Sequence, residues 1–415
     1  MLPWKRTARR RSPSFDVTRL LVLCVGLGLA IAPARVPATP HLPVSDGVVV
    51  ETLPIRYDPS LSGLTLLHQH AQRHASDPAA VLPLARAYIE AARRNGDPRF
   101  LGYAQSSLAA WPEGAGAPLD VRVLRATIHQ SLHQFTAALV ELDEVLAVQR
   151  EHAQALITRA TVLQVLGRYS EAQHDCAALW RSAGEVTTSL CLSSVASATG
   201  KLSTAGTLAQ RALLNSPVGD VAERLWATTL MAEISAHSGD YARAAAYFQA
   251  ALQLDANDRY ARGAYCDLLL DRGQPQQVLE LTSNQTRDDN LLLRRALALQ
   301  AFVDGTSAGE ALTSWQRQRD AALAQLRERH AAALLRGDRT HLREAARMAL
   351  FLEGDPRTAL QLARENWNIQ KEPADARILL EAATAMHDSV TRTQLANWLQ
   401  RSGMIDVRLA ALLRS

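Results

Sequence analysis

A spacing of small residues recurs along most of this chain, and it limits the possible folds more than any other feature. In the unit that begins at Ala153, Ala160 occupies position 8, Gly167 position 15, Tyr169 position 17 and Ala172 position 20. The same frame returns elsewhere with Ala232, Gly239, Tyr241 and Ala244, with Ala126, Phe135 and Ala138, and with Gly200, Leu202 and Ala205. A unit repeated at a fixed interval is one supersecondary element, and it needs its neighbours to bury its apolar face.

The residue types explain what each unit builds. Small residues at positions 8 and 20 let two helices cross closely, and glycine at position 15 ends the first helix at a tight turn. Unit starts fall at residues 82, 119, 153, 186, 225, 259, 291, 340 and 374. Most intervals are close to 34 residues, and the step of 49 residues before 340 predicts an extended helix near 308–336.

This spacing resembles the tetratricopeptide repeat, a helix–turn–helix unit of 34 residues with small residues at the same positions. The resemblance covers 82–407, roughly nine units, and implies an all-α solenoid of stacked hairpins. We expect residues 60–81 to form a capping helix and 408–415 to cap the other end. The resemblance extends to bacterial exported proteins made only of such repeats, for which the family implies no enzymatic activity and no cofactor.

The N-terminal segment, residues 1–34, has the pattern of a secretion signal. Six basic residues and one acidic residue accompany the uncharged apolar run Leu20–Ala32, which is followed by the small-residue pattern Ala32-Pro33-Ala34. The run has thirteen residues, whereas a spanning helix needs about 20. The pattern predicts export to the periplasm or secretion, with retention of the run as an inner-membrane anchor as the alternative.

Net charge gives little information about a partner once this segment is set aside. The whole chain carries a formal charge of +4, but residues 1–34 account for +5 and the remainder for −1. Arginines near 317–336 alternate with acidic residues, which is typical of a solvated helix face. We therefore expect no nucleic-acid partner. Residues 35–59 hold five prolines and predict an extended linker.

Motifs of catalytic chemistry are missing from the sequence. It has no glycine-rich phosphate loop, no nucleophile elbow and no paired C-x-x-C motif. The strongest cluster is His68, His70 and His74. Since His70 and His74 lie one helical turn apart, they are candidate metal ligands, with a solvated polar face as the alternative.

Three cysteines remain after residues 1–34 are set aside, which is an odd number. Buried, unreactive thiols are the default interpretation. In an oxidising compartment Cys176 and Cys191 could form a disulfide, because they lie on neighbouring helices of consecutive units, and Cys266 would then stay free.

The resemblance also indicates which face binds partners, because positions 2, 5, 9, 12 and 13 of the first helix line the concave groove in the family. Carried over to this chain, these positions give the candidate groove residues Gln130, Thr161, Gln164, Trp226, Glu233, Tyr260 and Asp267. The first part of this groove is neutral and polar, and the later part is acidic and aromatic. It lacks the Lys, Arg and Asn residues with which chaperone-binding members hold a peptide carboxylate. The prediction is thus a non-catalytic exported scaffold that binds a protein or peptide of the cell envelope. The alternatives are a metal-linked accessory protein using His68, His70 and His74, and a membrane-anchored assembly factor.

Overall fold

Aspartate residues start many of the helices, and their positions define the repeating units. Asp220, Asp240 and Asp258 each accept a hydrogen bond from a backbone N–H in the first turn of the helix that follows. Such caps satisfy donors that have no partner within the helix. Glycine in the left-handed region ends the first helix of several units, for example Gly167 at φ 75°. His133 takes the same conformation at φ 55° in the unit that lacks this glycine.

The computed structural model describes residues 63–414 except 115, 284–286, 336 and 339. Within these residues every regular element is helical, which confirms the predicted all-α fold. Both N-terminal predictions, the signal over 1–34 and the linker over 35–59, lie outside the described residues. Among the described helices, none combines the length and apolar character that crossing a bilayer requires.

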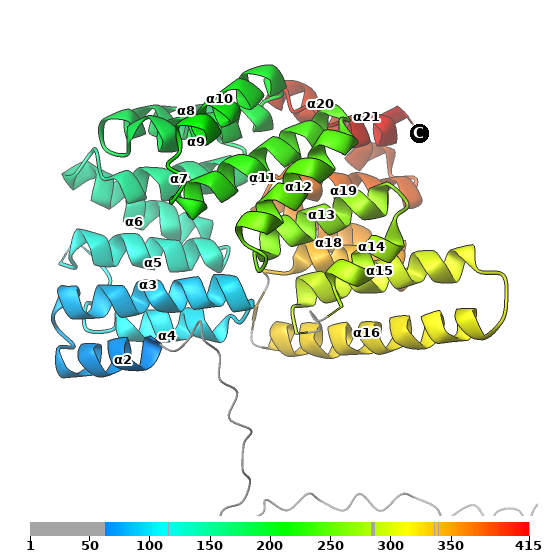
Figure 1. The fold of residues 1–415 in the computed structure, drawn as a ribbon, viewed down its shortest axis with the longest axis horizontal. Helices are drawn as coiled ribbons and strands as arrows, with labels where there is room; N and C mark the ends of the chain where they lie inside the picture. Colours follow the sequence, from blue (N-terminus) through cyan, green and yellow to red (C-terminus); the bar gives the residue numbers. More distant parts are fainter. Residues whose placement is uncertain (1–62, 115, 284–286, 336, 339, 415) are drawn as a thin grey trace, which may run out of the picture. The chain divides into compact units, whose positions relative to one another are not determined.

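The helices pair as consecutive hairpins (Figure 1). The first helices of the hairpins are α3 (Pro78–Asn95), α5 (Leu119–Ser131), α7 (Ala153–Val165), α9 (Gly184–Ala198), α11 (Val221–Ser238), α13 (Arg259–Asp271), α15 (Asp289–Gly305), α17 (Leu342–Phe351) and α19 (Pro373–Ala385). The second helices are α4 (Arg99–Ser107), α6 (Phe135–Val148), α8 (Tyr169–Ala178), α10 (Leu202–Asn215), α12 (Tyr241–Leu254), α14 (Pro275–Leu281), α16 (Glu310–Leu335), α18 (Pro356–Ile369) and α20 (Ser389–Ser402). Helix α2 (Leu64–Arg73) precedes the first hairpin, the short 3-10 helix η2 (Leu179–Arg181) follows α8, and α21 (Val407–Arg414) follows the last hairpin. The long helix expected near 308–336 corresponds to α16, which has 26 residues.

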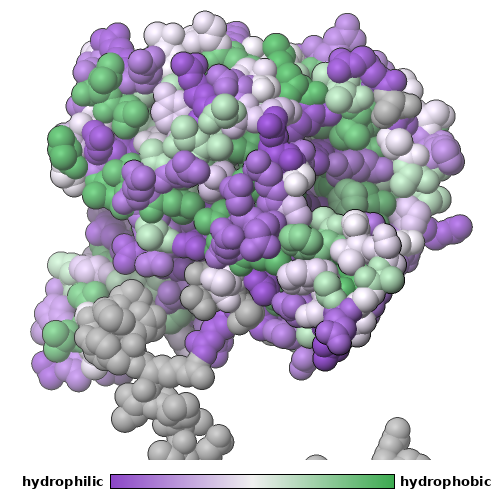
Figure 2. Space-filling view, turned by 45° about the vertical axis from the view of Figure 1, so that its right-hand side comes forward, coloured by the Kyte–Doolittle hydropathy of each residue, from purple (hydrophilic) through white to green (hydrophobic). Residues whose placement is uncertain are grey.

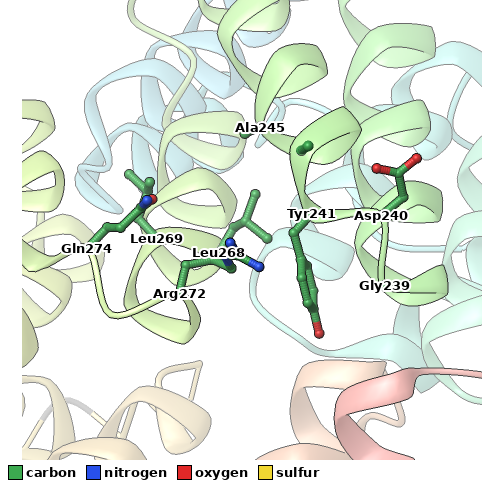
Figure 3. Close-up of a pocket in the computed structure, with 9 residues that line it drawn as sticks. Gly239, Asp240, Tyr241, Ala245, Leu268, Leu269, Arg272 and Gln274 are labelled. Carbon is green, nitrogen blue, oxygen red and sulfur yellow. The ribbon is translucent and has the colours of Figure 1, made fainter.

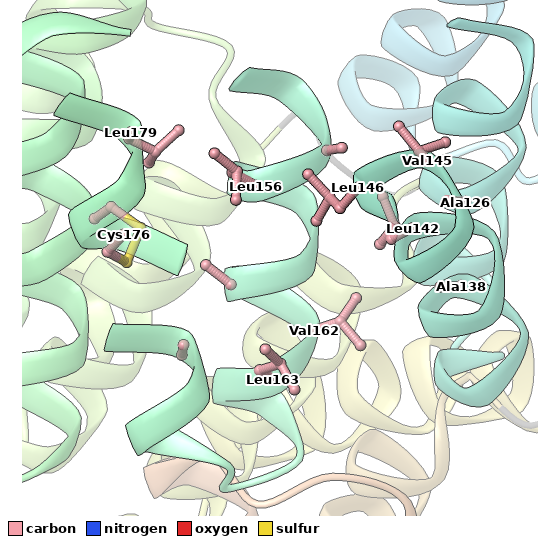
Figure 4. Close-up of a cluster of buried hydrophobic side chains, with 14 of the residues drawn as sticks. Ala126, Ala138, Leu142, Val145, Leu146, Leu156, Val162, Leu163, Cys176 and Leu179 are labelled. Carbon is pink, nitrogen blue, oxygen red and sulfur yellow. A yellow bond between two sulfur atoms is a disulfide. The ribbon is translucent and has the colours of Figure 1, made fainter. Parts of the chain in front are cut away.

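Small residues form the crossing points between the two helices of a hairpin. Ala126, Ala160 and Ala232, at position 8 of their units, are fully or almost fully buried, as are the alanines at position 20. Larger side chains such as Leu142 and Leu156 fill the space between neighbouring hairpins (Figure 4). Because burial of apolar surface contributes roughly 25 cal/mol per Å², this continuous layer stabilises the stack as a whole.

The last hairpins lie against the central ones, and we call the contact between residues 369–408 and helices α7–α13 the seam. The N–H of Lys371 donates to the carbonyl of Val165 over 2.8 Å. Arg377 forms two hydrogen bonds with the Asp271 carboxylate, at 2.7 and 2.6 Å. In Figure 1, α20 and α21 lie beside α10 and α11, and the structure records direct contact between α21 and α11. The hairpin stack therefore bends until its end meets its middle.

Candidate functional site

The residues predicted for the neutral part of the groove lie on α5 and α7. Gln130, Thr161 and Gln164 are all half-buried there. The Thr161 hydroxyl donates to the carbonyl of Ile157 over 2.9 Å, and the Gln164 amide donates to the carbonyl of Ala160 over 3.2 Å. These bonds stay within one helix and use one donor each, so the acceptor oxygens remain for a ligand.

Trp226 is partly buried between hairpins and is not an exposed anchor. It lies near the start of α11 and packs against two groups of buried side chains, one around Val162 and Leu163 and another around Leu190. Its ring therefore serves to join neighbouring hairpins.

Glu233 of α11 and Tyr260 of α13 form the centre of the acidic part. The Tyr260 hydroxyl donates to the Glu233 carboxylate, while 63% of Tyr260 remains exposed. Burial raises the pKa of Glu233 to about 7, and the Glu372 carboxylate acts in the same direction, while Tyr260 and Arg408 oppose them. The charge of Glu233 and burial together raise the pKa of the Tyr260 phenol well above its ordinary value. With a pKa of about 7, the Glu233 carboxyl is only partly ionised at neutral pH.

Asp267 already has cationic partners within the chain. Arg294 of α15 lies 2.5 Å from its carboxylate, and Arg347 of α17 lies 2.8 Å from it. Burial would raise the pKa of Asp267, but these two arginines hold it below its ordinary value. One helical turn further along α13, Asp271 is bound by Arg377 and lies 3.4 Å from Arg408.

The structure thus divides the predicted groove residues into two groups. Gln130, Thr161 and Gln164 lie along α5 and α7, and Glu233 of α11 meets Tyr260 of α13. Asp267 faces Arg347 of α17, and Asp271 faces Arg377 of α19 and Arg408 of α21; none of these arginines was predicted to lie in the groove. The sequence carries no local signal for these pairings, because the paired residues are 80 to 137 positions apart.

The histidines of α2 and its C-terminal end lie apart from this face. The Tyr88 hydroxyl lies 3.2 Å from Nδ1 of His68, and the rings of His70 and His74 are 5.1 Å apart between centroids. Across the described residues, no group of three or more His, Cys, Asp or Glu side chains is arranged to hold a metal ion. The rings of His70 and His74 are exposed, as expected for a polar face.

The cysteines are paired in one of the ways that the sequence left open. Cys176 and Cys191 form a disulfide with their Cα atoms 5.3 Å apart, which joins α8 to α9. Cys266 is free and buried, and burial raises the pKa of its thiol to about 12. A thiol with so high a pKa is a poor nucleophile at neutral pH.

Comparison with known proteins shows similarity at the level of structure. No protein-family model matches the chain, and no curated protein matches its sequence. Among solved structures, a tetratricopeptide repeat protein from Parabacteroides merdae is similar over 63% of this chain and 92% of its own, with 17% identity and a TM-score of 0.40. The Cut9–Hcn1 hetero-tetramer of APC/C is similar over 78% of this chain and 66% of its own, with 14% identity and a TM-score of 0.44. The human IFIT1 dimer with m7Gppp-AAAA is similar over 85% and 87% of the two chains, with 12% identity and a TM-score of 0.41.

Proposed function

We propose that the protein is a non-catalytic scaffold that binds a protein partner on the concave face of its central hairpins. One observation carries the proposal: Tyr260, at a predicted groove position, is 63% exposed with its hydroxyl bound to Glu233. A large aromatic side chain whose hydroxyl is fixed by a hydrogen bond while most of its surface stays exposed is a good anchor for a partner.

The surroundings of Tyr260 favour a partner with both polar and cationic groups. Half-buried Gln130 and Gln164 can bond to an extended peptide backbone, as amide side chains do in many peptide-binding grooves. The Glu372 carboxylate repels that of Glu233, and the charges of both carboxylates raise the pKa of Tyr260. A lysine or arginine side chain of the partner would reduce this repulsion.

The location of the protein is part of the proposal. The signal pattern in residues 1–34 supports export, with the mature chain in the periplasm or outside the cell. The Cys176–Cys191 disulfide supports the same compartment, because disulfides persist in oxidising environments. N-terminal sequencing of the mature protein tests this: a terminus near residue 35 supports cleavage, and a terminus at Met1 means that the apolar run is retained.

Partner binding is tested by affinity capture from envelope extracts with matched variants. Tyr260→Ala and Gln130→Ala change the concave face, while Val140→Ala changes a side chain on α6 that is 54% exposed. We expect the parent protein and Val140→Ala to capture at least one common partner. Tyr260→Ala should capture about tenfold less of it, as for loss of an aromatic anchor. Equal capture by all variants would show that the partner binds elsewhere.

A further inference from the structure

Four turns of the stack form a row, and they are equivalent in sequence. Gly167, Gly200, Gly239 and Gly273 each occupy position 15 of their unit and join the first helix of a hairpin to the second. All four have positive φ, between 65° and 88°. Since they share a conformation, differences in what covers them reflect the rest of the fold.

Side chains of the C-terminal hairpins cover the first three turns. A β-carbon on Gly167 would lie 3.4 Å from Lys371 and 3.5 Å from Trp398. One on Gly200 would overlap the carbonyl oxygen of Gly403 and lie 2.9 Å from Ile405, and one on Gly239 would lie 3.5 Å from Val407. At Gly273 no atom of the described residues lies within 4 Å of that position, so among these residues the fourth turn is uncovered.

A cavity of about 370 Å³ lies between the third and fourth turns (Figure 3). Its lining comes from both turns and from the helices that they join: Gly239, Asp240, Tyr241, Ala242, Ala245, Leu268, Leu269, Arg272 and Gln274. Leu268 and Leu269 are each 2% exposed and give the cavity an apolar floor. The volume is suited to one or two amino-acid side chains.

Arg272 provides a cation at the edge of this cavity. Its guanidinium lies over the Tyr241 ring, 5.4 Å from the centroid, and the residue is exposed. Among the described residues, no carboxylate lies within 4.0 Å of it. Asp240, the acidic residue of the lining, accepts a hydrogen bond from the N–H of Arg243, and Figure 3 shows it on the far side of Tyr241 from Arg272.

The neighbouring contact shows what chemistry such a turn accepts. In the sequence Ile405-Asp406-Val407, the two aliphatic residues cover Gly200 and Gly239. The carboxylate between them pairs with Arg408 at 2.5 Å and lies 3.8 Å from His237. At these two turns aliphatic side chains therefore lie against the glycines, while the carboxylate between them pairs with an arginine of its own segment.

From this we infer that the cavity between Gly239 and Gly273 binds a peptide segment of another protein, with a branched aliphatic side chain on Leu268 and Leu269 and a carboxylate on Arg272. A guanidinium binds a carboxylate through two parallel hydrogen bonds, which fixes orientation as well as adding affinity. The site lies on the turn edge of the stack and not on the concave face, so this inference and the proposed function can fail separately.

The probe is a short peptide with the sequence Ile405-Asp406-Val407, which covers the neighbouring turns within the chain itself. Acetyl-Ile-Asp-Val-amide is titrated into the mature protein with labelled methyl groups, and methyl NMR follows Leu268, Leu269 and Ala245. Acetyl-Ile-Asn-Val-amide lacks the carboxylate, and acetyl-Ala-Asp-Ala-amide lacks the branched side chains. We expect saturable shifts at these three residues with the first peptide, and at least about fivefold weaker binding of the other two.

Two variants and a control decide the role of the residues. Arg272→Gln should weaken binding of the aspartate peptide about fivefold and leave the asparagine peptide unchanged, and Ala245→Leu should block both by filling the cavity. Arg401→Gln, which removes another exposed arginine two residues before a turn glycine, should bind like the parent. Absence of saturable shifts, equal binding of the aspartate and asparagine peptides, or shifts confined to Val407 would each overturn the inference.

Discussion

Replacing Gly200 with alanine should open the seam, because no space exists for the added methyl group. The new β-carbon would overlap the backbone carbonyl of Gly403 and lie 2.9 Å from Ile405. A backbone atom cannot move aside as the end of a flexible side chain can, so the α20–α21 turn must shift. Overpacking of this kind costs about 1–3 kcal/mol.

Alanine at position 200 also destabilises the backbone, because φ is positive there. Gly273→Ala carries the same backbone penalty and therefore serves as the matched control. Gly200 has φ 73°, where alanine is disfavoured by about 1 kcal/mol. Gly273 has φ 65° at the same unit position and nothing within 4 Å. We therefore expect Gly200→Ala to lower the free energy of unfolding by about 2–4 kcal/mol and Gly273→Ala by about 1 kcal/mol.

Two assays read this difference. Urea unfolding gives the free energies of the parent and both variants, and amide hydrogen exchange reports the Lys371 N–H, which is bonded to Val165 across the seam. In Gly200→Ala this amide should exchange faster, while in Gly273→Ala it should exchange as in the parent. If the two variants agree within about 0.5 kcal/mol and Lys371 is protected equally, the seam is not the close contact described above.

The remaining predictions concern ionised groups and the disulfide. Burial raises the pKa of Glu233 in the folded protein from 4.5 to about 7, so the parent loses stability as the pH rises between these values. Glu233→Gln removes this loss. Its free energy of unfolding should therefore rise relative to the parent by about 1–2 kcal/mol over that pH range. Burial lowers the pKa of His237 in the folded protein from 6.5 to about 4, so the parent loses stability as the pH falls between these values. In His237→Gln the free energy of unfolding should therefore rise relative to the parent, by a similar amount, as the pH falls from 6.5 to 4. Glu141→Ala removes the carboxylate shared by buried Arg122 and Arg125, leaving Arg125 without a carboxylate partner and Arg122 with Glu144 alone, and should destabilise the protein by about 3 kcal/mol in urea unfolding. Replacing Cys176 and Cys191 by serine removes a cross-link with a sequence separation of 15 and should lower the free energy of unfolding by about 3 kcal/mol.

Each of these measurements has its own control. The two pH series should slope in opposite directions, and parallel slopes would contradict the assigned pKa shifts. Glu151→Ala, which removes a carboxylate that is 53% exposed and paired with an exposed arginine, should change stability by less than about 0.5 kcal/mol. The parent protein under reducing conditions should match the double serine variant, and a stable reduced protein would show that the disulfide contributes little.

The sequence was sufficient for the repeat frame, for a physical reason. Ala160 and Gly167 act on helices within their own unit, so their effect depends on spacing alone. Helices α5, α7 and α13 begin at 119, 153 and 259, where the predicted units begin. The predicted first unit at 82 differs from the structure, where α3 begins at Pro78, because Asp77 caps the helix and proline fits its first turn.

The arginines that pair with the predicted acidic groove residues could not be predicted in the same way. Asp267 was identified as a groove residue from its unit position, but Asp267 and its neighbour Asp271 bind arginines of α17, α19 and α21, up to 137 residues further along the chain. These contacts depend on how far the stack bends, and small differences in packing at every hairpin add up to that bend. Trp226 shows the same limit on a smaller scale, since its unit position indicated exposure while the neighbouring hairpin covers part of its ring.

Site-specific photo-crosslinking is the most direct test of the proposal that the concave face binds a protein. A photoreactive phenylalanine derivative replaces Tyr260 in one variant and Val140 in another, and both are irradiated in envelope extracts. The account predicts a crosslink from position 260 to the partner that the parent protein captures, and none to that partner from position 140. A partner that crosslinks from 140 and not from 260 would contradict it.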